Sequence, residues 1–377
     1  MAAQAVYVPI LKGKRGDLTA AGSVSTTVRG LMKPLVEAMP LNPKRNLSID
    51  EHVFSFCELV RHRLPLGEAF VDFYGLMPDA TTSDGVNAAI AGFKVLRGYG
   101  RRVTPTYGLE RNDDVWTELG RVVAEHGKGF CFRLGRDDIT VAQMEETWSE
   151  ITERTAQMGL LASEVDVLID LKSLGSNEPQ LLPDSIITFA QANPATARYR
   201  SLIVAGSSAL RTLGDETAHD SNFEVRRQEL HLWSTLWLDM PDTMRPIYAD
   251  YGVVHPDFSD QVSTKYMNGK VRYTVADKIV YFRGHGLYYP VKDLDQYHDL
   301  ARKVVEGGRF KGRGYSWGDA KVYDCATRQI RAGWPERWVA TDMNHHLTYV
   351  ANQVSRLIEQ FAVAETEAEA LEALAAP

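Results

Sequence analysis

The chain has 377 residues, of which 44% are hydrophobic and 24% are charged, a balance typical of a globular protein with a substantial core. No apolar run approaches the roughly 20 residues that cross a bilayer, and residues 1–11 lack the basic start and long apolar stretch of a signal peptide. The net charge of −7 argues against a general DNA-coating surface. Because we find neither a membrane span nor a signal peptide, we expect a cytoplasmic protein with no membrane partner.

Eight short β-rich runs recur in the first 251 residues, each followed by a polar turn. They lie at 7–11, 33–38, 69–74, 102–107, 129–134, 166–171, 200–205 and 247–251. Helical apolar spacing occupies most of the intervals, at 50–63, 86–96, 113–126, 140–158, 182–192 and 223–237. Ser48 or Asp50 is suited to cap the first of these helices.

This alternation predicts parallel strands, because a helical crossover returns the chain to the same end of a sheet. Eight such units close a TIM-like (β/α)8 barrel. The alternative is an open, doubly wound α/β sheet, whose first turn normally has the pattern GxGxxG. The first turn here, Gly13-Lys-Arg-Gly16, lacks that pattern, which favours the barrel.

The repeat breaks after residue 251. A hairpin is predicted within 264–282, a helix near 296–305, a Gly-rich stretch at 307–318 and a final helix over 343–363. We expect one barrel domain over 1–363, a long insertion at 257–342 that follows the eighth strand as a lid, and a flexible Ala/Glu-rich tail at 364–377. The three cysteines, Cys57, Cys131 and Cys325, are scattered and indicate buried, reduced thiols.

Five short segments resemble the "beta protein" family found in bacteriophages and bacterial mobile elements. They are Tyr7-Val-Pro-Ile-Leu-Lys-Gly-Lys-Arg-Gly-Asp17, Pro34-Leu-Val-Glu37, Tyr281-Phe-Arg-Gly284, Tyr315-Ser-Trp-Gly-Asp319 and Asn344-His-His346. The resemblance extends over nearly the whole chain and implies a role in phage biology or phage defence. The family has no settled activity, so the resemblance supplies no catalytic residues.

Charged side chains lie at or near the ends of several predicted strands, where barrel enzymes place their catalytic groups. The candidate catalytic residues are Lys12, Glu37, Asp72, Arg133, Asp170, Lys172 and Asp250. Converging carboxylates could hold Mg²⁺ or divide the roles of acid and base, and the cations could bind a phosphate. The alternative is a buried layer of ion pairs that closes the barrel.

A second set of candidates could bind a phosphate or carboxylate. Ser207 lies in a loop after the seventh strand, and the others lie in or after the insertion: Arg283, His285, Ser316, Asp319, Asn344 and His345. Asn344 and His345 are expected to open the last helix, where free N–H groups favour an anion. The alternatives are an asparagine cap followed by one packed and one exposed histidine, and an internal Arg283–Asp319 ion pair.

These features predict a hydrolase that acts on a phosphorylated or nucleotide-like substrate, with or without the help of a metal ion. The main alternative is a non-enzymatic module that binds or senses a protein or a nucleic acid in phage–host conflict. A glycosidase-like pair of carboxylates is a lesser possibility. The sequence leaves the metal, the substrate and the oligomeric state open.

Overall fold

Eight parallel strands form a closed ring in the computed structural model, which describes residues 5–375 except 66, 195–197, 213–217 and 258–266, with side chains as far as residue 364. In order around the ring they are β1 (Tyr7–Lys12), β2 (Leu35–Glu37), β3 (Phe70–Asp72), β4 (Thr104–Tyr107), β5 (Phe130–Leu134), β6 (Val165–Ser173), β7 (Ser201–Ser207) and β9 (Ile247–Asp250). Because β1 pairs in parallel with both β2 and β9, the ring closes. The predicted barrel is confirmed, and the open sheet is wrong.

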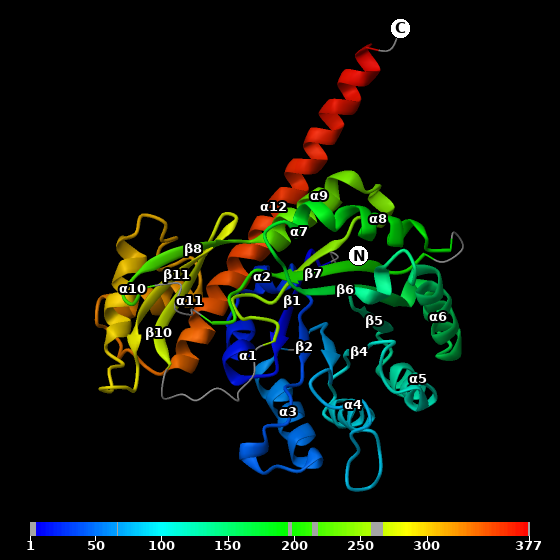
Figure 1. The fold of residues 1–377 in the computed structure, drawn as a ribbon, viewed down its shortest axis with the longest axis horizontal. Helices are drawn as coiled ribbons and strands as arrows, with labels where there is room; N and C mark the ends of the chain where they lie inside the picture. The colour runs from blue at the N-terminus through cyan, green and yellow to red at the C-terminus, as the bar shows by residue number, and fades with distance from the viewer. Residues whose placement is uncertain (1–4, 66, 195–197, 213–217, 258–266, 376–377) are drawn as a thin grey trace.

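Helices cover the outside of the ring (Figure 1). They are α1 (Arg15–Gly22), α2 (Thr26–Gly30), α3 (Ile49–Arg63), α4 (Ala88–Gly98), α5 (Trp116–His126), α6 (Met144–Gln157), α7 (Glu178–Leu181), α8 (Pro183–Gln191), α9 (Gln228–Asp239) and α12 (Pro335–Ala375). Ser48 and Glu51 form a capping box at the start of α3, and α5 ends at Gly127, whose φ of 60° suits glycine. Local sequence therefore sets the ends of both helices.

A three-stranded antiparallel sheet lies to one side of the barrel, with one helix packed on it and a second helix packed on the first (Figure 1). We call this unit the insertion subdomain; it comprises β8 (Asn222–Arg226), β10 (Asn268–Val275), β11 (Lys278–Gly286), α10 (Gln296–Glu306) and α11 (Trp317–Ala326). The predicted hairpin corresponds to β10 and β11, although its first residues, 264–266, lie outside the described part of the chain.

The start of the subdomain corrects two predictions. The helix predicted over 223–237 is wrong in its first turn, because Asn222–Arg226 is a strand that pairs with β11. Its alternating exposure follows the period of a strand, not of a helix. Since β8 precedes β9, the subdomain also takes a strand from before the predicted insertion.

The final helix begins at Pro335 instead of Met343 and continues to Ala375, so the predicted tail is helical up to that residue. Alanine and glutamate are strong helix formers, which accounts for the continuation. α12 packs against α1, α11 and β10, and thus lies between the barrel and the subdomain (Figure 1).

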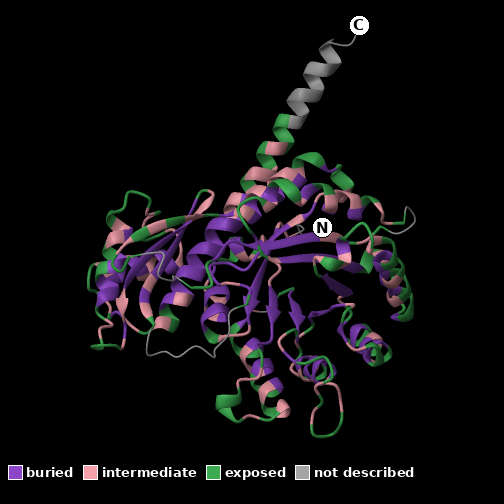
Figure 2. Cartoon of the chain, viewed as in Figure 1, coloured by how far each residue is buried: buried purple, intermediate pink, exposed green. Residues whose placement is uncertain are grey.

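The barrel strands are buried on both faces, whereas the outer helices are buried on one side only (Figure 2). The inner core contains Val8, Ile10, Leu35, Phe70, Cys131, Leu168, Ile203, Ala205, Ala249 and Tyr251. The three cysteines are buried and unbridged, as predicted.

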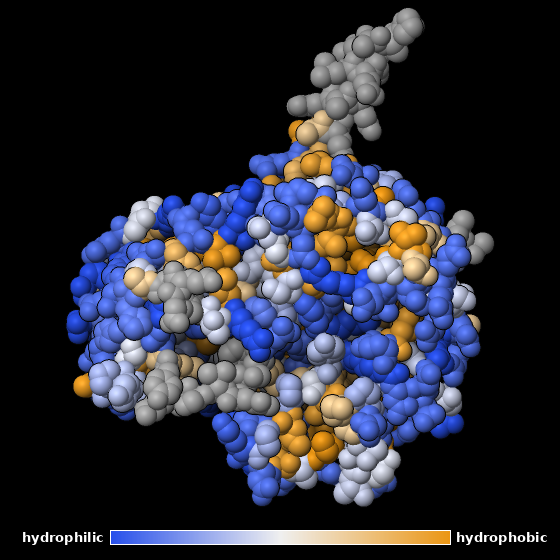
Figure 3. Space-filling view, in the orientation of Figure 1, coloured by the Kyte–Doolittle hydropathy of each residue, from blue (hydrophilic) through white to orange (hydrophobic). Residues whose placement is uncertain are grey.

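In the described residues, every helix is too short or too polar to span a bilayer. On the face shown in Figure 3, hydrophobic residues form separate patches, near α8 and near α3 and α4, within a mostly hydrophilic surface.

Candidate functional site

Six of the seven predicted catalytic residues meet at the carboxyl end of the barrel. Lys12, Glu37 and Asp72 stand in register on β1, β2 and β3, one layer above the apolar inner core. Two residues that the sequence analysis missed, Arg111 and Tyr251, complete the group. We call this set the mouth cluster: Lys12, Glu37, Asp72, Arg111, Arg133, Asp170, Lys172 and Tyr251.

Arg133 is the centre of the mouth cluster. Its Nη1 donates to Oδ2 of Asp72 at 2.8 Å, and its Nη2 lies 2.9 Å from Oε2 of Glu37. Its Nε and Nη2 also donate to Oδ2 of Asp170, at 3.0 and 2.7 Å. Arg133 is 3% exposed, so one guanidinium links three carboxylates inside the barrel.

Each carboxylate has a second cation as well. Lys12 pairs with Glu37, Lys172 with Asp170 at 2.7 Å, and Arg111 makes a bidentate pair with Asp72 at 2.6 and 3.0 Å. The mouth cluster therefore contains four cations and three carboxylates. With Tyr251 neutral, the net charge of these eight residues is +1, but the carboxylate of Glu110 contacts Arg111 at 3.3 Å and offsets this charge.

The three carboxylates are held in their ionised form. Burial raises their pKa values, but the opposing charges of Arg133 and a second cation outweigh burial and hold the pKa values of Glu37, Asp72 and Asp170 below the usual range. Each oxygen that accepts from these cations is unavailable to a metal. Within the described residues, no group of three or more His, Cys, Asp or Glu is placed to hold a metal ion, so the arrangement does not fit the predicted Mg²⁺ site.

The outer edge of the mouth cluster is aromatic and partly open. Lys172 lies 4.0 Å from the centroid of the Tyr74 ring, which is 42% exposed, and its Nζ donates to the Tyr251 hydroxyl at 3.0 Å. The Lys172 side chain is 28% exposed, and its backbone has a φ of 58°. Left-handed conformations are unfavourable for lysine and recur at ligand-binding positions. Lys172 and Tyr74 thus present a cation and a ring at the entrance.

Asp17, in the first turn of α1, is a further residue that the sequence analysis did not select. It is 2% exposed, and its Oδ1 has no hydrogen-bond partner in the described part of the chain. Burial raises the pKa of Asp17 to about 7, against the charges of Lys14, Lys12 and Arg272. Asp17 is therefore an acid close to the mouth cluster that can exchange a proton near neutral pH.

Asp250 does not belong to the mouth cluster, so the prediction that it lies with the other candidate catalytic residues is wrong. It lies on the outer face of β9, where the hydroxyls of Tyr7 and Tyr248 donate to it at 2.6 and 2.8 Å. His346 of α12 contacts its Oδ2 at 3.0 Å. The alternation of β9 explains the error, because Ala249 and Tyr251 face the interior and Asp250 cannot.

The predicted set of anion-binding residues is dispersed. Ser207 ends β7, and its Oγ accepts from the backbone N of Ala209 at 3.2 Å. His285, at the end of β11, contacts Asp293 at 2.9 Å on the subdomain surface. Arg283 is buried in the same strand, and its backbone N donates to Ser221 O at 2.9 Å. Ser207 thus lies on the barrel, whereas Arg283 and His285 lie on the insertion subdomain.

The remaining members join α11 to α12. Asp319 accepts from Ser316 and contacts Nδ1 of His345 at 2.9 Å, and Nε2 of His345 lies 2.9 Å from the carbonyl of Thr274. The expected Arg283–Asp319 ion pair is therefore not formed, because Asp319 is engaged by His345. Both histidine nitrogens face acceptors within the protein, which leaves none for a ligand.

Asn344 is equally occupied: it accepts from Gly318 N at 2.8 Å and donates to Ala20 O at 2.9 Å. Because α12 begins at Pro335, Asn344 and His345 lie inside the helix, where N–H groups are already bonded. The predicted anion site at a helix start is wrong. So is the alternative with one exposed histidine, since His345 and His346 are both buried.

A family model described as Beta protein matches residues 7–352. No curated protein is significantly similar in sequence. Among solved structures, a GH128 endo-beta-1,3-glucanase from Amycolatopsis mediterranei is 11% identical, over 54% of this chain and 88% of that chain, with a TM-score of 0.31. A triosephosphate isomerase from Bartonella henselae is 10% identical, over 64% and 90%, with a TM-score of 0.32. Neither likeness bears on substrate or mechanism.

Proposed function

We propose that this chain, which belongs to the Beta protein family, binds a phosphorylated, nucleotide-like small molecule at the mouth of its barrel. The main support is the cation at the outer edge of the mouth cluster: the Lys172 side chain is 28% exposed and lies 4.0 Å from the centroid of the Tyr74 ring. A cation at a partly buried entrance attracts an anion more strongly than one in open water, because the low local dielectric strengthens the attraction.

The entrance suggests how such a ligand is held. Lys172 is the most exposed cation of the mouth cluster, although its partner, Asp170, is buried. A phosphate that enters therefore contacts Lys172 first. Arg111 and Lys12 lie deeper, at 9% and 5% exposure, and add positive potential. Tyr74 is 42% exposed, and the part of its ring left open by Arg133 and Lys172, which lie 4.3 and 4.0 Å from the ring centroid, can contact a base. Together these groups suit a ligand with an anionic end and a flat end.

A second candidate function, hydrolysis of a phosphoester, is favoured by Asp17. Its pKa of about 7 lets it accept a proton at neutral pH, whereas Glu37 and Asp170 stay ionised as weak bases. In such a reaction a water oxygen bonds to phosphorus, the ester P–O bond breaks, and Asp17 takes the proton of the water. The leaving oxygen is then protonated by solvent. No metal is part of this proposal.

The setting we propose is the cytoplasm, in phage biology or in defence against phage. It is supported by the resemblance to the beta proteins of bacteriophages and bacterial mobile elements. A non-enzymatic sensor fits the same mouth cluster, because binding alone requires no proton transfer. Recognition of a protein or nucleic acid in place of a small ligand is then an outcome of the test.

The test compares nucleoside 5′-monophosphates with the matching nucleosides by titration calorimetry. Loss of one charge-assisted contact costs about 1.5–3 kcal/mol, so Lys172→Met should weaken nucleotide binding about 10- to 100-fold. Lys94→Met is the control, because Lys94 pairs with Glu118 on the outer helices. Equal affinity for nucleoside and nucleotide, or full affinity in Lys172→Met, would contradict the proposal. Release of phosphate by the wild type but not by Asp17→Asn would establish hydrolysis.

A further inference from the structure

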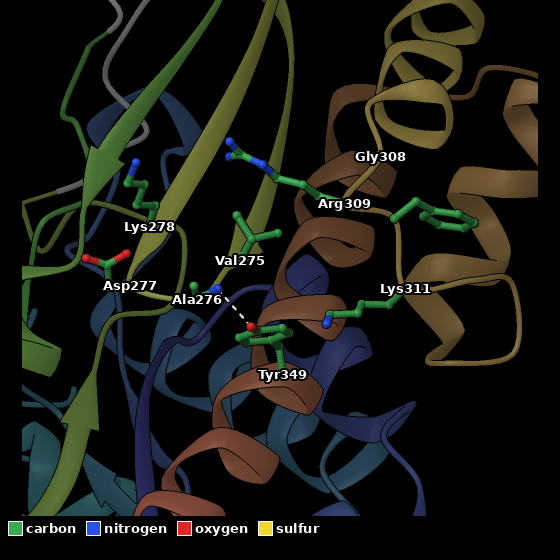
Figure 4. A pocket seen from close by; sticks show the side chains of 9 residues that line it. Val275, Ala276, Asp277, Lys278, Gly308, Arg309, Lys311 and Tyr349 are labelled. Carbon is green, nitrogen blue, oxygen red and sulfur yellow. Dashed lines mark hydrogen bonds between the residues drawn. The ribbon is translucent and has the colours of Figure 1, made fainter.

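A hollow of about 510 Å³ lies on the insertion subdomain and shares no residue with the mouth cluster. Three segments form its walls: the β10–β11 turn, the loop that follows α10, and Tyr349 of α12 (Figure 4). We call it the subdomain pocket. Its side chains include Lys278, Arg309 and Lys311, which come from two of these segments.

The walls of the subdomain pocket are fixed by hydrogen bonds. Ala276, in the turn, has a φ of 46°, and its backbone N donates to the Tyr349 hydroxyl at 2.7 Å. Its carbonyl accepts from Arg227 at 3.2 Å and from Gln353 at 3.0 Å. On the opposite side, the backbone N of Lys311 donates to the Tyr273 hydroxyl at 2.9 Å. A pocket with anchored walls loses little conformational freedom when a ligand binds.

Three cations, Lys278, Arg309 and Lys311, line the pocket together with one carboxylate, Asp277, so the charge of its lining is positive. Glu224 pairs with both Lys278, at 2.6 Å, and Arg309. Asp277 lines the pocket, but its carboxylate is engaged by Arg226 at 3.2 Å and by His231 at 3.2 Å.

Lys311 differs from these cations. In the part of the chain that the structure describes, no acidic side chain pairs with it, and its Nζ lies 5.4 Å from the centroid of the Tyr349 ring (Figure 4). A cation without an acidic partner at the edge of a preformed hollow is suited to an anionic group.

A smaller hollow, of about 240 Å³, adjoins the subdomain pocket and shares Arg309 with it. Lys303 and Glu224 are among the residues that line it. Arg309 therefore stands between two spaces that each contain a further lysine. A ligand with one anionic group would use one space, whereas a ligand with two linked groups can use both.

We propose that the subdomain pocket binds a ligand through two linked phosphate groups, one at Lys311 and one at Arg309. Guanidinium groups bind phosphate with a two-pronged geometry, and a lysine adds a mobile point charge. Tyr349 is 7% exposed, so its ring offers little surface for stacking a base. The ligand is accordingly recognised by its diphosphate, which inorganic pyrophosphate and a nucleoside diphosphate both contain.

The test titrates the whole chain with inorganic pyrophosphate and, separately, with inorganic phosphate. We expect pyrophosphate to bind at least 10-fold more tightly, and the Arg309→Ala and Lys311→Ala variants each to lose about 10-fold or more in affinity. Lys311→Arg, which keeps the charge, should retain binding. Arg313→Ala is the matched control, because its 58% exposed side chain pairs with Asp324 outside the pocket. Circular dichroism reports whether each variant is folded.

The outcomes also separate this site from the barrel mouth. Pyrophosphate binding that survives Lys172→Met and fails in Lys311→Ala supports the subdomain pocket, even if nucleotides do not bind the mouth. The opposite pattern, or equal affinity for phosphate and pyrophosphate, overturns the proposal. Equal affinity for ADP and pyrophosphate supports a free diphosphate ligand. Tighter binding of an oligothymidylate, whose phosphates are separated by sugars, would also overturn a directly linked diphosphate as the ligand.

Discussion

Replacing Arg133 with methionine tests how the mouth cluster is held together. Arg133 pairs with Glu37, Asp72 and Asp170, which are 2%, 0% and 3% exposed. Removing one partner of a buried ion pair costs about 3–5 kcal/mol, because a charge is left without compensation. Each carboxylate here retains one other cation, so we expect the low end of that range, about 3 kcal/mol at pH 7.

The loss should depend on pH in a defined direction. In the wild type the three carboxylates have lowered pKa values, so their contribution to stability is constant from pH 7 to 5 and is lost only as the pH falls below about 4. Without Arg133, burial dominates and their pKa values rise. Carboxyls with raised pKa values stabilise the fold more as the pH falls, because the folded state then binds protons more readily. The difference between wild type and Arg133→Met should therefore shrink between pH 7 and 5.

Urea unfolding followed by the fluorescence of the seven tryptophans measures both effects. Arg15→Met is the control, because Arg15 and Glu336 form an ion pair with side chains 60% and 48% exposed, and its midpoint should not change. Adding Asp170→Asn to Arg133→Met should recover part of the loss by removing one buried charge. An Arg133→Met protein as stable as Arg15→Met, or a difference that grows on acidification, would refute the reasoning.

Two further predictions concern Asp17 and the contact between α11 and α12. Burial raises the pKa of Asp17 from 3.8 to about 7, so the contribution of this group to stability is present below pH 4 and is lost as the pH rises through 7. Asp17→Asn should therefore stabilise the fold at pH 8, by at most about 4 kcal/mol, and should not stabilise it at pH 4. Thermal melts at the two pH values check this, and equal shifts at both would contradict it. A Cβ at Gly318 would lie 2.3 Å from Thr341 O, so Gly318→Ala should cost about 1–3 kcal/mol in urea unfolding. Gly98→Ala, which meets nothing within 4 Å, should be neutral or stabilising, and equal effects at the two glycines would exclude the packing explanation.

The barrel could be predicted because its signals are local and repeated. Each strand is a short apolar run and each helix has its own period, so the count of eight units needs no knowledge of distant contacts. The alternation of inward and outward side chains along a strand correctly predicts that Lys12 and Glu37 lie above the apolar interior. Applied to β9, it also excludes Asp250 once Ala249 and Tyr251 are recognised as inward-facing. That error was avoidable from the sequence.

Other features could not be predicted from local patterns. Arg111 and Tyr74 lie in loops beyond strand ends, where no strand register fixes the direction of a side chain. Likewise β8 is a five-residue strand whose partner, β11, lies more than 50 residues later, and its two apolar residues also suit the helix that follows. Asp17 has no sequence signature, because its raised pKa comes from burial that only the packed fold creates.

The adjacent histidines of α12 show how a pattern suggestive of a ligand site can serve assembly instead. Burial lowers the pKa of His346, and as a neutral ring it donates to Asp250 of β9 at 3.0 Å and accepts from Thr274 of β10 at 2.7 Å. One imidazole thus connects the eighth barrel strand to the subdomain sheet. Tyr349, one turn further along α12, forms a wall of the subdomain pocket. Because the same helix bonds to β9 and lines the pocket, α12 fixes the subdomain pocket relative to the eighth strand of the barrel.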